Sequence, residues 1–291
     1  MAHGLDTEEL LRRIRECGGE ILYVGELNIT SIPSLPSTLK YLYCVNTNIT
    51  ELPPLPDTLE DLYCSHTNIT ELPPLPDTLE TLCSSHTNIT ELPPLPSTLV
   101  TLNCNHTNIT ELPPLPDTLK TLYCYGTNIT ELPPLPLNLN YLNCSGTKIT
   151  VFPPLPNTLE ILYFNHTNIT ELPPLPDTLR TLCCYNTNIT ELPPLPNTLK
   201  TLICYNTKIT ELPPLPYTLE WLNAIDSPLI LQRNERESIK AYIARWEEWR
   251  EKKRTQERCR VVRDDLLAAA LHPRRVEKWI NQYGIEVLDS L

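Results

Sequence analysis

A strict period of twenty residues governs most of this sequence. The tetrapeptide TNIT or TKIT begins at residues 47, 67, 87, 107, 127, 147, 167, 187 and 207, and LNIT begins at residue 27. With Leu59 as repeat position 1, one unit reads LEDLYCSHTNITELPPLPDT and ends at Thr78. Leucine or isoleucine occupies positions 1, 4, 11, 14 and 17, and proline occupies positions 15, 16 and 18. Because no such unit can bury its apolar residues alone, the chain must fold by stacking its neighbouring copies.

Each unit predicts one short strand followed by an extended return segment. Positions 3 to 5 alternate outward, inward and outward, and successive strands should stack in parallel about 4.8 Å apart. The return segment ELPPLP cannot form a helix, because its prolines lack amide donors and fix φ, so we expect a polyproline-like chain. The spacing matches the leucine-rich repeat pattern L-x-x-L-x-L-x-x-N-x-L, with Cys in the third apolar position and Thr in place of Asn. We expect this Thr to bond the turn backbone through its hydroxyl group.

These features predict a leucine-rich repeat solenoid with α-helical caps at both ends. The parallel β-sheet should line the concave side and the extended, polyproline-like segments the convex side. We divide the chain into an N-terminal helical cap at 1–19, about ten repeats at 20–226 and a C-terminal helical segment at 227–291. In the last segment, helices are expected over 234–271 and 274–283.

The N-terminal cap is predicted from the sequence DTEELLRRIREC at 6–17. Asp6 has the side chain of an N-cap residue, and acidic residues follow it in the first turn. The spacing of Leu10, Leu11 and Ile14 predicts one apolar helix face that covers the first repeat. A capping helix is needed because the terminal repeats of a solenoid would otherwise expose their core.

Two stretches of the sequence resemble known families. The unit with its P-P-L-P return is similar to the 20-residue, bacterial-type leucine-rich repeats of secreted effectors of enteric pathogens. The units of the form LYCSHTNITELPPLPDTLE and the terminal HPRRVEKWINQYGIEVLDSL more closely resemble leucine-rich repeat proteins of large, amoeba-infecting DNA viruses (Marseillevirus-like). The resemblance implies a non-catalytic interaction protein, although a fold alone does not carry a function.

The repeats differ from one another mainly at positions that strand geometry places on the concave side. Positions 3, 5, 7 and 8 are rich in Tyr, Asn, His and Ser, a composition typical of binding sites, where Tyr offers contact area at a low entropy cost. The alternative is recent duplication followed by drift, with Tyr kept because it suits strands. We predict a partner-binding face that consists of Tyr43, Tyr63, Tyr123, Tyr125, Tyr141, Tyr163, Tyr185, Tyr205, His66, His86, His106 and His166.

Two features of this face invite a sharper interpretation. Gly126 and Gly146 remove the side chain at position 8 in adjacent repeats and predict a notch walled by tyrosines, either an anchor pocket or a neutral gap. His66, His86 and His106 should stack about 5 Å apart along one edge. Two of these rings could converge on one zinc or nickel ion, but no carboxylate or thiolate clearly completes the site. We therefore favour solvated imidazoles and predict neither a metal nor a cofactor.

The cysteines and the N-terminus predict an intracellular location. Seven of the eleven cysteines occupy the inward position 6, where Ser84 and Phe164 replace them in other copies, so this is a packing position. An odd number of cysteines without a CxxC pair argues against disulfides, and free thiols suit a reducing compartment. The chain starts without the apolar stretch of a signal peptide and has no apolar run near the roughly 20 residues that span a bilayer. We expect a protein of the host cytoplasm or the virion that is neither secreted nor membrane-bound.

Charge and composition favour binding over catalysis. The segment from residue 227 carries 14 Lys and Arg against 11 Asp and Glu, a net charge of +3. Because the whole chain has a net charge of −12, the residues before 227 carry −15. This acidic balance disfavours nucleic acid as a partner. Cys259 lies in a charged stretch without a paired base, so no enzyme is expected.

We therefore predict a module that binds a protein or peptide, and the viral resemblance implies a host protein. Self-association is a further possibility, because the basic C-terminal helix of one copy could dock on the acidic repeats of another. Two alternative functions stay open from the sequence: a structural or virion-associated scaffold, and a substrate adaptor of a ubiquitin-ligase-type effector.

Overall fold

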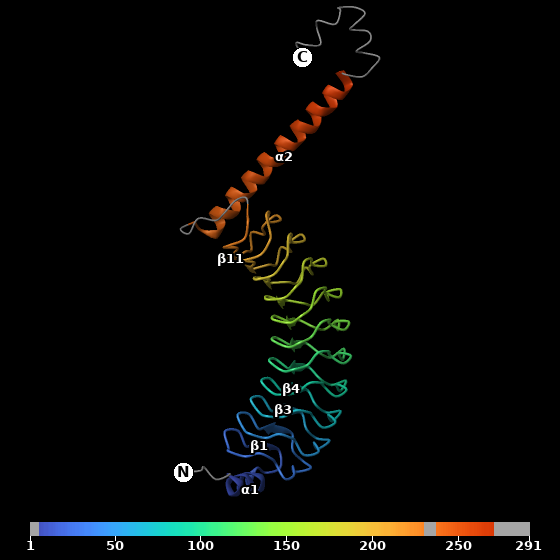
Figure 1. Cartoon of the computed structure of the whole chain (residues 1–291), viewed down its shortest axis with the longest axis vertical. Helices are drawn as coiled ribbons and strands as arrows, with labels where there is room; N and C mark the ends of the chain where they lie inside the picture. Colours follow the sequence, from blue (N-terminus) through green and yellow to red (C-terminus); the bar gives the residue numbers. More distant parts are fainter. Residues whose placement is uncertain (1–5, 230–236, 271–291) are drawn as a thin grey trace, which may run out of the picture. The chain divides into compact units, whose positions relative to one another are not determined.

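The computed structural model describes residues 6–229 and 237–270, and of residues 257–270 it describes only the backbone. The chain divides into two compact units, Met1–Gln232 and Arg233–Leu291. The first unit contains the repeats, and the second contains one long helix (Figure 1).

Each strand of the first unit covers positions 3 to 5 of one repeat. Over the described residues, eleven strands form one parallel sheet whose order follows the sequence. Identical repeat positions are paired throughout, for example Leu62 with Leu82. This architecture confirms the predicted leucine-rich repeat solenoid. The strands are β1 (Ile21–Tyr23), β2 (Tyr41–Tyr43), β3 (Asp61–Tyr63), β4 (Thr81–Cys83), β5 (Thr101–Asn103), β6 (Thr121–Tyr123), β7 (Tyr141–Asn143), β8 (Ile161–Tyr163), β9 (Thr181–Cys183), β10 (Thr201–Ile203) and β11 (Trp221–Asn223).

The core of the solenoid consists of stacked, identical layers. In the repeat that starts at Leu59, the side chains of Leu62, Cys64 and Ile69 are also fully buried, as the twenty-residue pattern predicts. The residues on either side of Leu62 in β3 are only half-buried, because a strand points alternate side chains to opposite faces. From Leu39 onward, every layer buries its leucines of positions 1 and 4 against the layers before and after it, so burial depends on the stack.

Two threonine ladders satisfy the backbone between the layers. The Thr67 hydroxyl donates to the Cys64 carbonyl at 2.8 Å, and the equivalent bond recurs from Thr47 to Thr207 at 2.6–2.9 Å. This contact confirms the predicted role of Thr at position 9. At position 20, the Thr78 hydroxyl lies 2.8 Å from the carbonyl oxygens of both Asp57 and Leu59. Buried carbonyl groups thereby find donors where the strand ladder has ended.

The return segments contain neither helix nor strand, as their prolines predict. Backbone bonds still tie them to the stack: the amide of Asn68 donates to the carbonyl of Ile49 in the previous repeat at 2.9 Å. A tight turn then leads into the next strand, where the amide of Leu79 donates to the carbonyl of Pro76 at 3.1 Å. The extended chain is therefore held at both of its ends.

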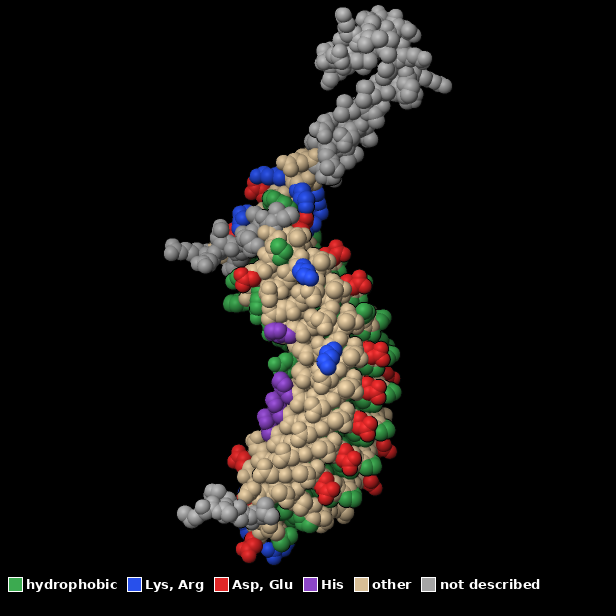
Figure 2. Space-filling model, viewed as in Figure 1, with side chains coloured by type: hydrophobic (Ala, Val, Ile, Leu, Met, Phe, Trp, Pro, Cys, Tyr) green, Lys and Arg blue, Asp and Glu red, His purple; other side chains and the backbone are tan. Residues whose placement is uncertain are grey.

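Charged and aromatic side chains separate onto opposite edges of the first unit. Its repeats follow an arc, and Figure 2 shows Asp and Glu side chains along the outer edge and His side chains along the inner edge. Exposed glutamates recur at position 13 in the return segments, for example Glu71 and Glu91. The inner edge carries the residues that follow the strands, so the predicted concave side is the side of the sheet.

Helix α1 (Thr7–Glu16) begins and ends within one residue of the predicted bounds, but its contacts differ from the prediction. Asp6 makes no side-chain cap; instead its Oδ2 accepts from the Asn28 amide at 2.8 Å, while its own amide donates to the Asn28 carbonyl at 3.1 Å. Leu10 is 2% exposed, whereas Leu11 is 44% exposed. The prediction that Leu11 belongs to the covered face was wrong, because each helical residue turns about 100° from its neighbour and the repeat covers a narrow stripe.

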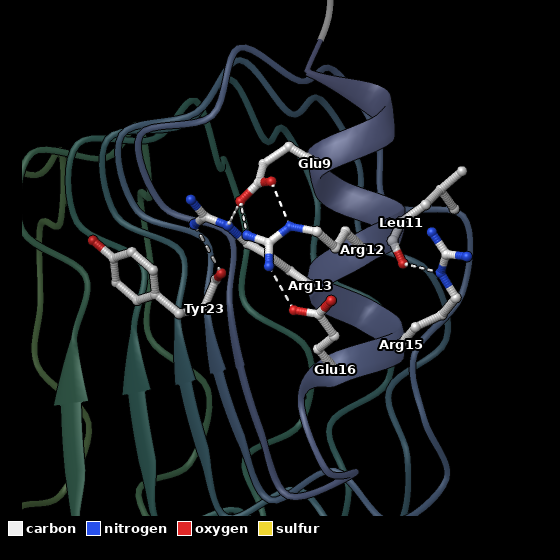
Figure 3. Close-up of polar contacts among 7 residues, drawn as sticks. All are labelled: Glu9, Leu11, Arg12, Arg13, Arg15, Glu16 and Tyr23. Atoms are coloured by element: carbon white, nitrogen blue, oxygen red, sulfur yellow. Dashed lines mark hydrogen bonds and ion pairs between the residues drawn. The ribbon is translucent and has the colours of Figure 1, made fainter.

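An ion-pair network on α1 fastens the helix to the first strand (Figure 3). Glu9 accepts from Arg12 Nη2 and from Arg13 Nε, each at 2.7 Å, and Arg12 also pairs with Glu16. Hydrogen bonds from Arg12 and then Arg13 hold the pKa of Glu9 down at about 2. Arg13 Nη1 donates to the carbonyl of Tyr23 at 3.1 Å, so the helix occupies an acceptor on the outer edge of β1.

The second unit contains helix α2 (Ile239–Ala270). Arg245 in this helix forms a bidentate pair with Glu237, which precedes the helix: Nη2 and Nε donate to its carboxylate at 2.6 and 2.8 Å. The ring centroids of Trp246 and Trp249 lie 5.1 Å apart. Of the helices predicted for this segment, the one over 274–283 lies outside the described residues. Among the residues that are described, no helix has the length and apolar composition that a bilayer crossing requires.

Candidate interaction face

The residue at position 8 turns the chain after each strand in a left-handed conformation. Its φ is +56° at His66, +54° at Asn186 and +69° at Gly126, and the other repeats are similar. Glycine adopts this conformation freely, and Asn and His tolerate it better than most residues. The alternation of Asn, His and Gly at this position therefore follows from the backbone as well as from any contact with a partner.

The predicted notch at the two glycines does not exist. A Cβ at Gly126 would lie 2.7 Å from Nδ1 of His106, so the imidazole of the preceding repeat already covers this position. A Cβ at Gly146 would lie 3.4 Å from Cε2 of Tyr125. The prediction was wrong because it treated the missing side chains as empty space. The His106 ring fills the space at Gly126, and the Tyr125 ring lies in van der Waals contact with the position of a Cβ at Gly146.

The structure arranges the twelve predicted face residues into four aromatic clusters. In the first, the rings of Tyr43 and Tyr63 are stacked with centroids 4.8 Å apart and planes 9° apart. Tyr23, which the sequence-based set omitted, extends this cluster at 6.2 Å from Tyr43 and is exposed. Tyr23 occupies position 5 of the degenerate first repeat, so the twenty-residue period was enough to assign it to the same face.

The second cluster is a row of histidines. The centroids of His66 and His86 lie 4.3 Å apart, and those of His86 and His106 lie 4.4 Å apart, which confirms the predicted stacking. The ring of Tyr125 closes the row edge-on at 4.5 Å from His106. Burial, and then the neighbouring His106 and His66, lower the pKa of His86. Among the described residues, no group of three or more His, Cys, Asp or Glu side chains is placed to hold a metal ion.

The third cluster lies on the strands themselves. Tyr141 packs between Tyr123, at 4.6 Å, and Tyr163, at 5.8 Å, with tilted rings. Burial is the main reason that the pKa of Tyr141 lies far above its ordinary value, and the two neighbouring tyrosines add to it. Burial also raises the pKa of Tyr163, so the phenols of Tyr141 and Tyr163 stay neutral throughout the physiological range and act as hydrogen-bonding groups on a half-buried aromatic surface.

The fourth cluster joins aromatic rings to an amide chain. Tyr185 stacks on Tyr205 at 4.4 Å and 9°, and His166 meets Tyr185 edge-on at 5.3 Å. Asn206 Nδ2 donates to Asn186 Oδ1 at 2.6 Å, and Asn186 Nδ2 lies 3.1 Å from His166 Nε2. The two asparagines were not among the predicted site residues, because a single Asn in a turn carries no signal of such a chain.

A polar hollow adjoins the fourth cluster. Its volume is about 450 Å³, and positions 8, 9 and 10 of three consecutive repeats line it. Repeated Asn and Thr side chains make up most of its hydrogen-bonding wall, and His166 and Lys208 complete the lining. In the repeat that contains β11, Trp221 and Ile225 occupy the outward positions 3 and 7, and their side chains are exposed.

The outward face of the sheet is almost free of charge. From Leu39 to Thr218, the only Asp, Glu, Lys or Arg at positions 3, 5, 7 and 8 is Asp61. The chain before residue 227 nevertheless has a net charge of −15, from −12 for the whole chain less +3 for the remainder. Carboxylates therefore gather at positions 2, 13 and 19, away from the aromatic clusters. The resulting face combines rings, hydroxyl groups and amides.

Comparisons with known proteins agree with this architecture. A family model of two leucine-rich repeat copies matches residues 177–217. YopM from Yersinia enterocolitica is similar over 70% of this chain and 50% of its own, with 31% identity and a TM-score of 0.62. A Shigella effector leucine-rich repeat domain is similar over 58% of this chain and 80% of its own, with 32% identity and a TM-score of 0.53. The chain is a leucine-rich repeat protein.

The similarity has definite limits. This leucine-rich repeat protein matches only half the length of the YopM chain. A chain from the octameric complex of Latrophilin 3, Unc5D and FLRT2, in which FLRT2 is the leucine-rich repeat component, has 20% identity and a TM-score of 0.54. The match covers 66% of this chain and 68% of that chain, and at this identity it shows the fold alone. No protein with a curated description matches the sequence.

Proposed function

We propose that this leucine-rich repeat protein is a non-catalytic module that binds a protein or peptide through the concave aromatic face. The observation that carries the proposal is the separation of chemistry on the solenoid. Four clusters of packed aromatic rings lie on a surface with one carboxylate, while the rest of the charge lies elsewhere. The fold commonly serves protein–protein interaction, and the FLRT2 repeats within an octameric complex are one instance.

The rigidity of the clusters supports this function. The tyrosines of the first and third clusters stand on three-residue strands, whereas Tyr185 and Tyr205 lie two residues after theirs. Each of these rings already contacts a ring of a neighbouring repeat. Binding would therefore immobilise few additional rotatable bonds, and less of the interaction free energy would be lost to ordering. The ring contacts between neighbouring repeats hold the tyrosine side chains in place.

The fourth cluster provides the test of the proposed face. We expect Tyr185→Ala with Tyr205→Ala to weaken partner binding at least about 30-fold, since one hot-spot tyrosine contributes about 2 kcal/mol and 1.4 kcal/mol is tenfold. The control is Tyr217→Ala, which removes a tyrosine that is 79% exposed at position 19, outside the concave positions. Peptides selected from a display library on the wild type would be titrated calorimetrically against all three proteins. Full affinity in a folded double variant would contradict the proposal.

We further propose that the partner is a host protein and that the module acts in the cytoplasm of an infected amoeba or in the virion. The resemblance of the repeats and of the terminal HPRRVEKWINQYGIEVLDSL to proteins of amoeba-infecting viruses supports this. The same three proteins serve as baits in amoebal lysate. A protein captured by the wild type and by Tyr217→Ala, and lost with the double variant, is the expected result. Recovery only from purified particles would favour a virion scaffold.

Self-association is a second candidate function, favoured by the charge distribution. The outer edge carries exposed glutamates such as Glu71 and Glu111, and α2 carries a run that includes Lys252 and Lys253. We propose that the helix of one copy docks on the acidic edge of another. Sedimentation should then show dimers or larger species at about 0.1 M salt that dissociate toward 1 M, where the screening length falls from about 10 to 3 Å.

A charge reversal tests this docking independently of salt. Lys252→Glu with Lys253→Glu is expected to leave a monomer at low ionic strength, because like charges would face one another. The matched control is Lys208→Glu, an exposed lysine on the repeats. A wild-type protein that is monomeric at every salt concentration would exclude this second function and leave the concave-face proposal intact.

A further inference from the structure

The left-handed turn at position 8 tolerates the row formed by His66, His86 and His106 but does not require it. All three lie in left-handed turns, with φ between +51° and +56°. Glycine meets this requirement without strain and asparagine with little, and the chain uses both at the same position in Gly126 and Asn186. Three consecutive imidazoles therefore stand where smaller residues would suit the backbone better. Such strained positions are a reason to look for a role of the side chain.

The geometry of the row makes the three rings one unit. Their planes are 10° apart between His66 and His86 and 30° apart between His86 and His106, at centroid distances of 4.3 and 4.4 Å. Tyr125 blocks the far end with its edge. In neutral form the rings pack favourably, but two adjacent imidazolium ions at this distance repel one another. Protonation and stacking therefore oppose each other.

The surroundings of the row offer little compensation for positive charge. Within residues 6–229 and 237–270, no hydrogen bond or ion pair to the rings of His66, His86 or His106 is present. Asp61 is the one Asp, Glu, Lys or Arg at the outward positions that neighbour the row. The other titratable residues there are His66, His106, Tyr63, Cys83, Tyr123 and Tyr125. The outer glutamates belong to the opposite edge of the arc (Figure 2).

We propose that His66, His86 and His106 form a proton-responsive element within the interaction face. Proton uptake converts a stacked, neutral row into adjacent cations, separates the rings and makes this stretch of the face cationic. The consequence for binding rests on the proposed function: a partner that contacts the neutral row at pH 7 would bind less well on acidification unless it presents carboxylates there. The titration itself does not depend on any partner.

The direction of the linkage follows from the central ring. Burial, then His106 and His66, hold the pKa of His86 below its ordinary value. The unfolded chain therefore binds more protons than the folded chain as the pH falls through the ordinary range of histidine, about 6.5. The stabilisation is complete above that range and decreases as the solution is acidified.

Removing the neighbours of His86 tests the proposal directly on the full chain. Ring-proton NMR would follow the titration of His86 in the wild type and in His66→Asn with His106→Asn. We expect a midpoint below about 6.5 in the wild type that rises toward this value in the double variant. Asparagine occupies this position in other repeats, so the backbone should be unaffected. The matched control is His166→Asn, which removes the histidine whose neighbour is Tyr185 and should leave the His86 midpoint unchanged.

Thermal unfolding gives a second readout. Between about pH 7.5 and pH 5, the wild type and His166→Asn should lose more in Tm than the triple variant His66→Asn, His86→Asn, His106→Asn. A His86 midpoint that is the same with and without its neighbours would overturn the proposal, as would equal pH sensitivity of the triple variant. Both measurements use the protein alone, so failure of the concave-face function would leave their outcome unchanged.

Discussion

Replacing Leu142 with alanine is expected to lower the free energy of unfolding by about 2–5 kcal/mol, the usual range for truncating a buried leucine. Leu142 is the inward residue of β7 and has 0% exposure, with Leu122 and Leu162 paired to it on either side. The substitution removes contacts to both neighbouring layers at once. Because a solenoid is stabilised only by such nearest-neighbour interfaces, a defect in its middle weakens the coupling between the two halves.

The chain supplies a matched control five residues earlier. Leu137 is 77% exposed at position 19, so Leu137→Ala should change the free energy of unfolding by no more than about 0.5 kcal/mol. Urea unfolding followed by far-UV circular dichroism measures both variants. A broadened or two-step transition for Leu142→Ala alone would show uncoupled halves. Equal, small effects of both substitutions would contradict the layered core described above.

The second large expected effect concerns the cysteines at position 6. Burial raises the pKa of the Cys44, Cys104 and Cys204 thiols to about 12, from an ordinary value near 9. Three pH units lower the thiolate fraction at pH 8 by roughly 1000-fold, and the thiolate is the reactive form. Alkylation of these cysteines in the folded protein should therefore be slower than in the urea-unfolded chain by at least this factor.

Site-resolved mass spectrometry after brief alkylation measures the effect. Cys17, which is half-buried at the end of α1, is the internal reference and should be labelled in the folded state. The position 6 thiols also point toward backbone carbonyls, as Cys144 does to Tyr163 at 3.5 Å. Rapid labelling of Cys104 at a rate close to that of Cys17 would mean that the layers open locally on the timescale of the reaction.

Much of the fold could be predicted because the same local interactions recur in every twenty-residue unit. The alternation around Leu62, the prolines of the return segment and the hydroxyl of Thr67 each act within one unit or on the next. Once the period is known, one unit determines all of them, and parallel pairing in register is the arrangement that aligns every leucine. The sequence also predicted that His66, His86 and His106 would stack, because equal positions in adjacent repeats must lie one strand spacing apart.

What the tertiary structure decided was which neighbours fill the space around a position. No local pattern shows that His106 leans over Gly126, that Tyr125 covers Gly146, or that Asp6 bonds Asn28. These contacts depend on side-chain rotamers and on the left-handed turn at position 8, which a sequence periodicity does not specify. The exposure of Leu11 likewise depends on how much of α1 the first repeat covers. The period therefore determined the scaffold and the residues on its face, and three-dimensional packing determined how those residues group into surfaces.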